Sequence, residues 1–206
     1  RTDIERKRQH GLAATASSGS GTRTGLYADD ATRTAYGRVL ALAHEAIAGG
    51  FTVVADGAFL RRWQRDLFRS AAASLGVPFA ILSVRGHPAT LERRIAARAR
   101  ASTDASEADA AVLADQLMTE EPLADDEAPR VVRWNGERPV STLRSSPAWS
   151  RLTTLTGDPE ATRAGPEHPG VPTAQQAVVE FLSRPSSHAE GSGRVEVIET
   201  HWSWVF

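Results

Sequence analysis

The sequence contains no cysteine, a single lysine and no long hydrophobic run. The absence of cysteine excludes disulfides, cysteine-ligated zinc, iron–sulfur clusters and thiol catalysis. No stretch approaches the length of about 18 apolar residues that identifies a membrane-spanning helix, so no membrane partner is expected. A net charge of −1 provides no basic field, and we therefore expect no nucleic-acid partner either. Arginine supplies almost all of the basic charge, because Lys7 is the only lysine.

The remaining composition is that of an ordinary globular protein, with 41% hydrophobic and 24% charged residues. A chain of 206 residues suits one domain plus a substantial extra segment. The sequence begins with Arg1 instead of methionine and shows no signal-peptide pattern. We therefore expect a cytoplasmic protein whose natural start lies elsewhere.

The first 135 residues alternate between helical and strand-like patterns. Asp30 is predicted to cap a helix that Gly49 and Gly50 end, and the apolar run at 51–56 is typical of a buried parallel strand. This alternation with short connections predicts an α/β fold with a parallel sheet. The other predicted helices cover 1–12, 60–75, 88–100 and 106–120, and the other predicted strands cover 78–84 and 130–134.

The character of the sequence changes after residue 140. Residues 141–173 are rich in proline, serine and threonine and are predicted to form a linker. An amphipathic helix is predicted at 174–184, and an alternating apolar strand at the end of the chain. The predicted organisation is a domain at 1–140, the linker at 141–173 and a further segment at 174–206.

Asp56 is the strongest local candidate for a functional residue. Ligands of open α/β sheets bind beyond the carboxyl ends of the strands, which is where Asp56 stands. A carboxylate there could hold Mg²⁺ through water and so serve a bound nucleotide. The alternative is that Asp56 only caps the helix that follows.

Arg94 and Arg98 form a second candidate. They are four residues apart in a predicted helix and therefore share one of its faces. Paired guanidinium groups beside a polar loop suit the binding of phosphate oxygens. The alternative is a solvated face on an arginine-rich protein.

Other common site patterns are missing. The glycine-rich segment at 17–25 has no preceding strand, and Thr22 stands where a phosphate-binding loop requires lysine. The histidines are scattered, which argues against a histidine-ligated metal. No serine lies in a nucleophile elbow, so a nucleotide-independent hydrolase has no support.

Taken together, the stretches TDIERKR, YADDATRTAYGRVLALAHEAIAGGFTVVADGAFLRRWQRDLF and ASEADAAVLADQLMTEEPL resemble a known family. It is the small P-loop kinase domain of bacterial bifunctional aminoglycoside phosphotransferase/ATP-binding proteins. The resemblance covers about residues 1–135 and implies a three-layer parallel sheet of the P-loop NTPase type. The phosphate-binding loop of that family lies upstream of the position that matches Arg1, so we expect the domain to be N-terminally incomplete.

The resemblance also implies roles for individual residues. Asp3 matches an acidic position suited to a general base. Asp56 matches the acidic residue at the end of the Walker-B-like strand, and that residue holds Mg²⁺ through water. Arg94 and Arg98 match arginines that contact the phosphates of ATP. Gln116 and Glu121 match a Q-x-x-x-x-E-P-L stretch, whose role the sequence does not indicate.

Residues 174–206 resemble the start of the phosphotransferase-like half of the same proteins and stop before any catalytic loop. The expected function is phosphoryl transfer from Mg²⁺-ATP to a small acceptor that the sequence does not identify. Without its phosphate-binding loop, this chain is expected to be inactive. The alternative is a non-enzymatic, degenerate α/β remnant or a partner-binding module.

Overall fold

The computed structural model describes residues 1–21, 23–101 and 104–157, together with the backbone of a strand at 204–205. The helix predicted at 174–184 lies outside the described residues, as does most of the strand predicted at the end of the chain. None of the described helices is both long and apolar enough to cross a membrane.

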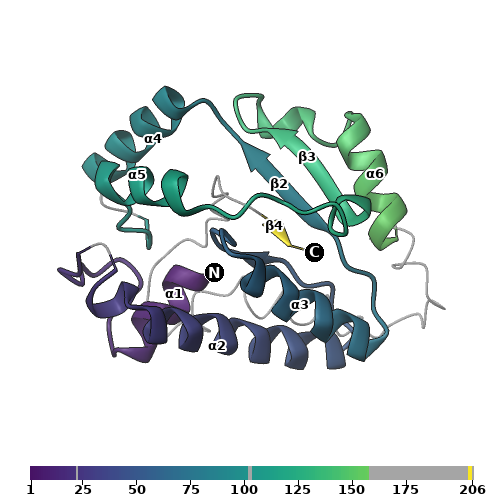
Figure 1. Ribbon diagram of the computed structural model, residues 1–206, viewed down its shortest axis with the longest axis horizontal. Helices are drawn as coiled ribbons and strands as arrows, with labels where there is room; N and C mark the ends of the chain where they lie inside the picture. Colours follow the sequence, from purple (N-terminus) through teal and green to yellow (C-terminus); the bar gives the residue numbers. More distant parts are fainter. Residues whose placement is uncertain (22, 102–103, 158–203, 206) are drawn as a thin grey trace, which may run out of the picture. The chain divides into compact units, whose positions relative to one another are not determined.

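The described strands form one sheet in the order β1-β4-β2-β3 (Figure 1). Its strands are β1 (Ala55–Asp56), β2 (Ile81–Arg85), β3 (Val131–Asn135) and β4 (Trp204–Val205). β2 and β3 are parallel, with Ile81 opposite Val131, which confirms that part of the prediction. β4 runs antiparallel to both of its neighbours, so the sheet as a whole is mixed.

The prediction of a parallel strand at 51–56 is wrong in two respects. Only Ala55 and Asp56 join the sheet, and the strand beside them is the antiparallel β4. Gly50 turns the chain with a φ of 82°, and the side chains of Thr52 and Val54 are exposed. The apolar, β-branched composition therefore identified an extended segment, but most of this segment makes no ladder.

The predicted helices of the first 120 residues are all present, with shifts at their ends. Gly49 ends α2, and Gly76 ends α3 in the left-handed conformation with a φ of 65°. Asp30 does not cap α2, because the helix already begins at Asp29 and the Asp30 carboxylate accepts the N–H of the next residue. The bounds are α1 (Thr2–Gln9), α2 (Asp29–Ala48), α3 (Arg62–Leu75), α4 (Pro88–Ala101) and α5 (Ala110–Thr119), with short 3-10 turns at Gly25–Tyr27, Ala128–Arg130 and Val140–Thr142.

A further helix, α6 (Pro147–Thr156), lies inside the predicted linker, and the prediction of irregular structure is wrong there. Ser146 caps the helix by accepting the N–H of Trp149, and Pro147 occupies the first turn, where its missing N–H costs nothing. Leu152 of α6 is buried against Leu82 and Trp134 of the sheet. The proline that suggested a linker is thus a helix-start signal.

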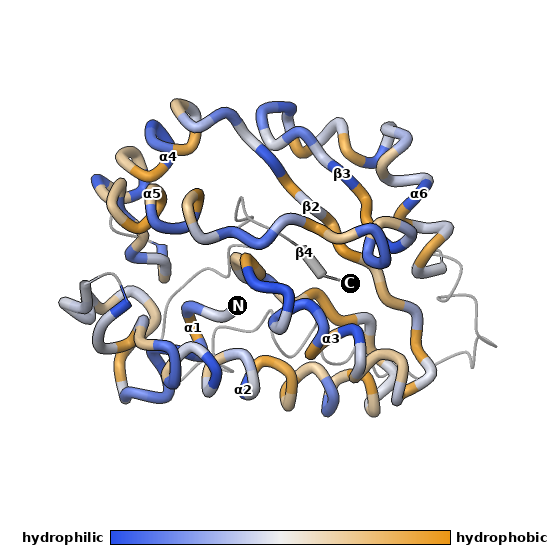
Figure 2. The backbone as a smooth tube through the Cα atoms, viewed as in Figure 1, coloured by the Kyte–Doolittle hydropathy of each residue, from blue (hydrophilic) through white to orange (hydrophobic). Residues whose placement is uncertain are grey.

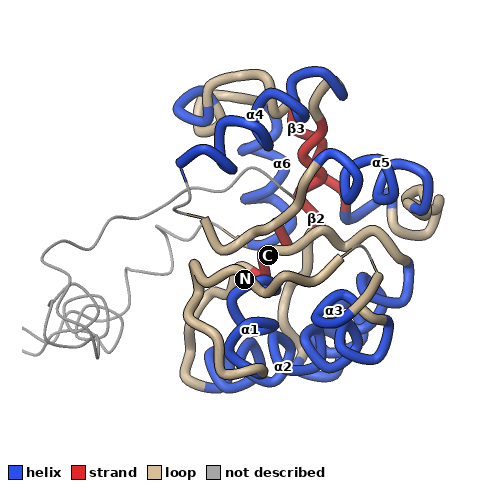
Figure 3. The backbone as a smooth tube through the Cα atoms, turned by 90° about the vertical axis from the view of Figure 1, so that its left-hand side faces the viewer, coloured by secondary structure: helices blue, strands red, loops and turns tan. Residues whose placement is uncertain are grey.

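The hydrophobic residues form separate clusters. Tyr36, Phe59 and Phe68 join α2, the end of β1 and α3 through edge-to-face ring contacts. α1, α2 and α3 lie together in Figures 1 and 3. Figure 2 shows hydrophobic residues along β2 and β3, which pack on α6. Leu91, Ile95 and Leu113 join α4 to α5.

Candidate functional site

Asp56 ends β1 as predicted, and Arg1 reaches it from the start of α1. Arg1 Nε lies 3.1 Å from Asp56 Oδ2, and Arg1 Nη2 lies 3.0 Å from Asp104 Oδ1. One guanidinium group therefore bridges two carboxylates that come from distant parts of the chain. Both carboxylates are largely shielded from solvent, which strengthens the attraction.

The pKa of Asp104 reports this charge arrangement. Burial alone would raise the pKa, but the N–H of Ser106, the hydrogen bond from Arg1 and the charge of Arg98 outweigh burial and lower it. Asp104 is therefore a stable anion. Within the described ranges, no group of three or more histidine, cysteine, aspartate or glutamate side chains could hold a metal ion.

Asp3 lies in the first turn of α1, half-buried, close to the end of β1. The first turn of α1 and this strand end approach closely, because a Cβ added to Gly57 would lie 2.7 Å from Thr2 Cγ2. Burial, with the charge of Asp3 as a further contribution, raises the pKa values of both Tyr27 and Tyr36 to about 12. Asp3 and Asp56 both act on Tyr36, which places them around the same phenol.

The two predicted phosphate-binding arginines both lie on α4, but each donates to the backbone. Arg94 Nη2 donates to the carbonyl of Gly136 at 2.7 Å, and Arg98 Nη2 donates to that of Ala108 at 3.3 Å. Arg98 also acts electrostatically on Asp104 and so belongs to the surroundings of the Arg1 bridge. Arg94 instead lies near the loop after β3, so the structure does not bring the pair to one point.

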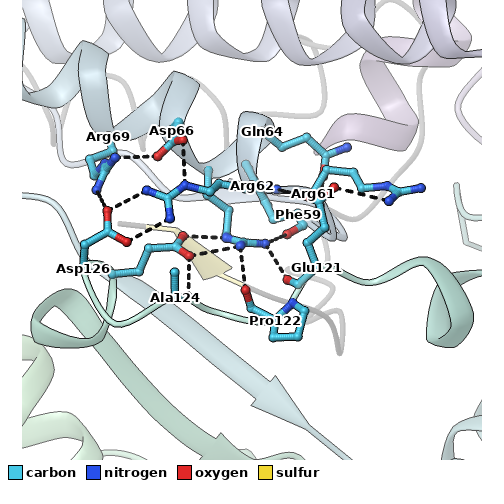
Figure 4. Close-up of polar contacts among 12 residues, drawn as sticks. Phe59, Arg61, Arg62, Gln64, Asp66, Arg69, Glu121, Pro122, Ala124 and Asp126 are labelled. Carbon is cyan, nitrogen blue, oxygen red and sulfur yellow. Dashed lines mark hydrogen bonds and ion pairs between the residues drawn. The ribbon is translucent and has the colours of Figure 1, made fainter.

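The loop after β1 is fixed by a buried ion pair that the sequence did not indicate. Arg65 of α3 and Glu127 have side chains only 4% and 1% exposed, and Arg65 Nε lies 2.6 Å from Glu127 Oε1. A second bond joins Arg65 Nη2 to Glu127 Oε2 at 3.0 Å. The rest of the guanidinium donates to the carbonyls of Phe59, Leu60, Glu121 and Pro122. Figure 4 draws the contacts with Phe59, Glu121 and Pro122.

Phe59 sits in this loop with a φ of 46°, a conformation that is costly for a residue with a side chain. Its N–H donates to Tyr36 Oη at 3.1 Å and its carbonyl accepts from Arg65. Contacts on both sides thus hold the strained residue directly after the strand that carries Asp56. Such strain is found at functional sites more often than elsewhere.

Glu121, whose role was open, binds the start of α3. Its carboxylate accepts the N–H of Arg62 at 2.6 Å and lies 3.3 Å from Arg61 Nη1. The backbone N–H of Arg62 belongs to the first turn of α3, which has no intrahelical acceptor. These contacts, with the favourable position at a helix N-terminus, lower the pKa of Glu121. The E-P-L stretch therefore attaches the segment after α5 to α3.

Lys7 is also structural. Its amino group is buried, lies 2.8 Å from Glu107 Oε1 and donates to the Ala14 carbonyl. Ser18, in the glycine-rich segment, donates its N–H and its hydroxyl to the same carboxylate. Burial opposes ionisation of Glu107, but these donors prevail and lower its pKa. The glycine-rich segment thus binds a carboxylate of its own chain.

Two cavities flank the sheet at opposite ends of the strands. One, of about 290 Å³, is mainly apolar and lies among α2, α3 and the segments that precede β1 and β2. The other, of about 90 Å³, extends along β2 to the carboxyl ends of β1 and β2. Its lining includes Ser83, Gln116 and Glu120 together with leucines of α4 and α5. The second cavity occupies the region where open α/β sheets bind their ligands.

A comparison with protein families shows which family the chain belongs to. Residues 1–123 match the model of the family described as AAA domain. The chain belongs to this AAA-domain family. Residues 1–123 therefore form a nucleotide-binding domain of the P-loop-kinase type, as the resemblance implied. None of the curated proteins and none of the solved structures compared with the chain matches it.

Proposed function

We propose that this AAA domain binds ATP with Mg²⁺ at the end of β1 and belongs to a kinase that phosphorylates a small acceptor. The observation that carries the proposal is the position of Asp56 at the carboxyl end of a strand, with Asp104 brought beside it. Carboxylate oxygens are ligands that Mg²⁺ prefers, so the donor chemistry fits. Mg²⁺, when bound, would neutralise charge on the phosphates.

Arg1 competes with a cation for these oxygens. Its guanidinium group now neutralises both carboxylates, so Mg²⁺ can bind only after the Arg1 side chain leaves. Arg1 is partly exposed, and its departure breaks no backbone contact. Arg98, beside Asp104, would then exchange its hydrogen bond to the Ala108 carbonyl for one to a phosphate. Arg94 would likewise exchange its bond to the Gly136 carbonyl for one to a phosphate.

Asp3 is proposed as the general base for the acceptor hydroxyl. It lies on α1 near Asp56 and makes no hydrogen bond with the other described residues, so its oxygens are available to accept a proton. We further propose that the domain has a three-layer P-loop fold. We also propose that it is related to proteins that carry an aminoglycoside-phosphotransferase-like half. Support for both comes from the sequence resemblance.

The printed 206 residues contain no G-x-x-x-x-G-K-[ST] sequence. That element supplies the backbone N–H groups and the lysine on which most phosphate stabilisation in this type of kinase depends. We therefore infer that the 206-residue polypeptide binds Mg²⁺-ATP weakly and transfers no phosphate by itself.

Calorimetric titration of the purified 206-residue chain with ATP, with and without Mg²⁺, tests this proposal. Saturable binding that requires Mg²⁺ is expected, and Asp56→Asn should weaken it about 10-fold or more, as loss of a metal-orienting group does. Asp30→Asn, an exposed aspartate of α2, is the matched control and should change nothing. Phosphate release should stay at the level of buffer.

The second candidate is a non-enzymatic remnant. It predicts no saturable Mg²⁺-ATP binding, and that result would refute the proposal. ATP hydrolysis that disappears in Asp56→Asn would instead refute the inferred inactivity while supporting the kinase assignment.

A further inference from the structure

The cavity that extends along β2 to the carboxyl ends of β1 and β2 is lined by two neutral polar side chains that make no hydrogen bond with other described residues. Ser83 of β2 is only 7% exposed, lines this cavity, and its hydroxyl makes no hydrogen bond with any described residue. The Ser83 hydroxyl is not one of the fully buried polar atoms that lack a partner, so it is accessible from the cavity and a bound group can reach it. Gln116 of α5 lines the same cavity and its amide is likewise without a hydrogen bond among the described residues.

The charged side chains of the lining, in contrast, are already neutralised. Arg65 is saturated by Glu127 and by backbone carbonyls. Arg85 and Glu120 bind each other through both nitrogens and both oxygens, with Arg85 Nη1 2.7 Å from Glu120 Oε2. A charged ligand would find no opposite charge here without breaking one of these pairs.

The remaining wall is apolar and small. Phe59, Leu91, Leu113 and Leu117 contribute to it, and the volume is about 90 Å³. For comparison, an engineered apolar cavity of about 150 Å³ holds benzene. The cavity therefore suits a compact apolar group smaller than benzene that carries one neutral polar function.

We propose that this cavity binds the neutral, alcohol- or amide-bearing part of the acceptor, and that Ser83 and Gln116 recognise its polar atom. The role as acceptor site rests on the proposed function, whereas binding in the cavity does not require ATP. A polycationic aminoglycoside does not fit, because Glu120, the one carboxylate among the described lining residues, is paired with Arg85 and the volume is too small. Gln116 thereby gains the function that its sequence motif left open.

Three probes with a branched four-carbon skeleton and different charge test the assignment: isobutyramide, isobutyrate and isobutylamine. The ¹⁵N-labelled 206-residue chain is titrated with each probe, and the Ser83 amide and the Gln116 side-chain amide are followed by NMR. Isobutyramide should shift both signals saturably, and the two charged probes should not. Equal binding of all three probes overturns the proposal.

Variants locate the site. Ser83→Ala and Gln116→Leu should each weaken isobutyramide binding by about 2- to 13-fold, the effect of one neutral hydrogen bond. Ser70→Ala, an exposed serine of α3, is the control and should leave the affinity unchanged. Gln116→Glu should transfer the preference to isobutylamine. Unchanged isobutyramide binding in both Ser83→Ala and Gln116→Leu, with native circular dichroism, contradicts the assignment.

ATP titrations separate this proposal from the kinase proposal. Isobutyramide binding without any Mg²⁺-ATP binding refutes the kinase and supports the cavity. Mg²⁺-ATP binding without isobutyramide binding does the reverse. If ATP displaces isobutyramide, the cavity holds the nucleotide base, and its role as acceptor site is overturned.

Discussion

Replacement of Glu127 by alanine tests whether the Arg65–Glu127 pair holds together the loop after β1. The substitution removes two charge-assisted bonds to Arg65 and the acceptor of the Ala124 N–H. Breaking a buried pair by deleting one partner costs about 3–5 kcal/mol, because the other charge is left without compensation. Arg65 keeps its bonds to backbone carbonyls, so we expect the lower end, about 3 kcal/mol.

Urea unfolding followed by the fluorescence of the five tryptophans measures this cost. Asp126→Asn is the matched control, because Asp126 is the neighbouring acid and binds Arg62 and Arg69 at the surface. Its effect should be much smaller. A loss below about 1 kcal/mol for Glu127→Ala, similar to a surface pair, would refute the reasoning.

The double variant Arg65→Met/Glu127→Leu refines the test. Replacing a whole buried pair by apolar residues is often neutral. Here, however, the carbonyls of Phe59, Glu121 and Pro122 would lose their donor. We therefore expect the double variant to recover only part of the stability. Full recovery would show that these carbonyl bonds contribute little.

The same pair predicts a response to acid. Burial raises the pKa of Glu127, but the hydrogen bonds from Arg65 and the Ala124 N–H and the charge of Arg65 outweigh burial, so the pKa lies below its ordinary value of 4.5. Glu127 therefore stabilises the fold above pH 4.5 and loses this contribution as the pH falls through its folded pKa. Glu127→Gln should lower the stability at neutral pH and flatten its decline in acid.

Three further outcomes are expected. Both tyrosines, Tyr27 and Tyr36, should stay protonated at pH 10 and ionise near pH 12, so the stability of the fold should fall as the pH rises from 10 to 12. Ultraviolet absorbance measures the phenolate, and phenolate in the native protein at pH 10 contradicts this prediction. Lys7 is buried, so amine-reactive reagents should modify it only as fast as the protein opens, which mass spectrometry can follow. Rapid modification of Lys7 under native conditions would exclude its buried ion pair. Leu152→Ala should cost about 2–5 kcal/mol in urea unfolding, whereas the exposed Ser150→Ala should cost far less; equal effects would mean that α6 does not pack on the sheet.

The elements that sequence patterns predicted correctly are those with local start and stop signals. Gly76 ends α3 and Gly50 turns the chain after α2 because glycine readily takes the positive φ found at both positions. Pro88 opens α4 because its missing N–H is unused in a first turn. The place of Asp56 at a strand end follows from the same kind of local information. The sequence patterns do not predict α6, because a composition rich in proline is typical of a linker, whereas Pro147 starts a helix.

The polar contacts of the site could not be predicted, because they join residues far apart in sequence. Asp125, Asp126 and Glu127 form an acidic run in which only Glu127 is buried, and nothing in the run distinguishes it. Arg1 and Asp104 are likewise 103 residues apart in sequence, and only the fold brings them together. Composition gives the number of charged residues, and the packing of the helices on the sheet determines which of them become buried and paired.

The placement of β4 has a consequence for the order of folding. Among the described strands, β1 joins the β2–β3 pair through β4, which is the last of them in sequence. On the ribosome, β2 and β3 can pair as soon as both have emerged, whereas β1 must wait for residues 204–205. The two portions of the sheet are thus joined by a contact of very long sequence separation, which is the slow kind to form. A nascent chain exposes the unpaired edges of β1 and β2 until synthesis has passed these residues, and it is most prone to aggregate during that interval.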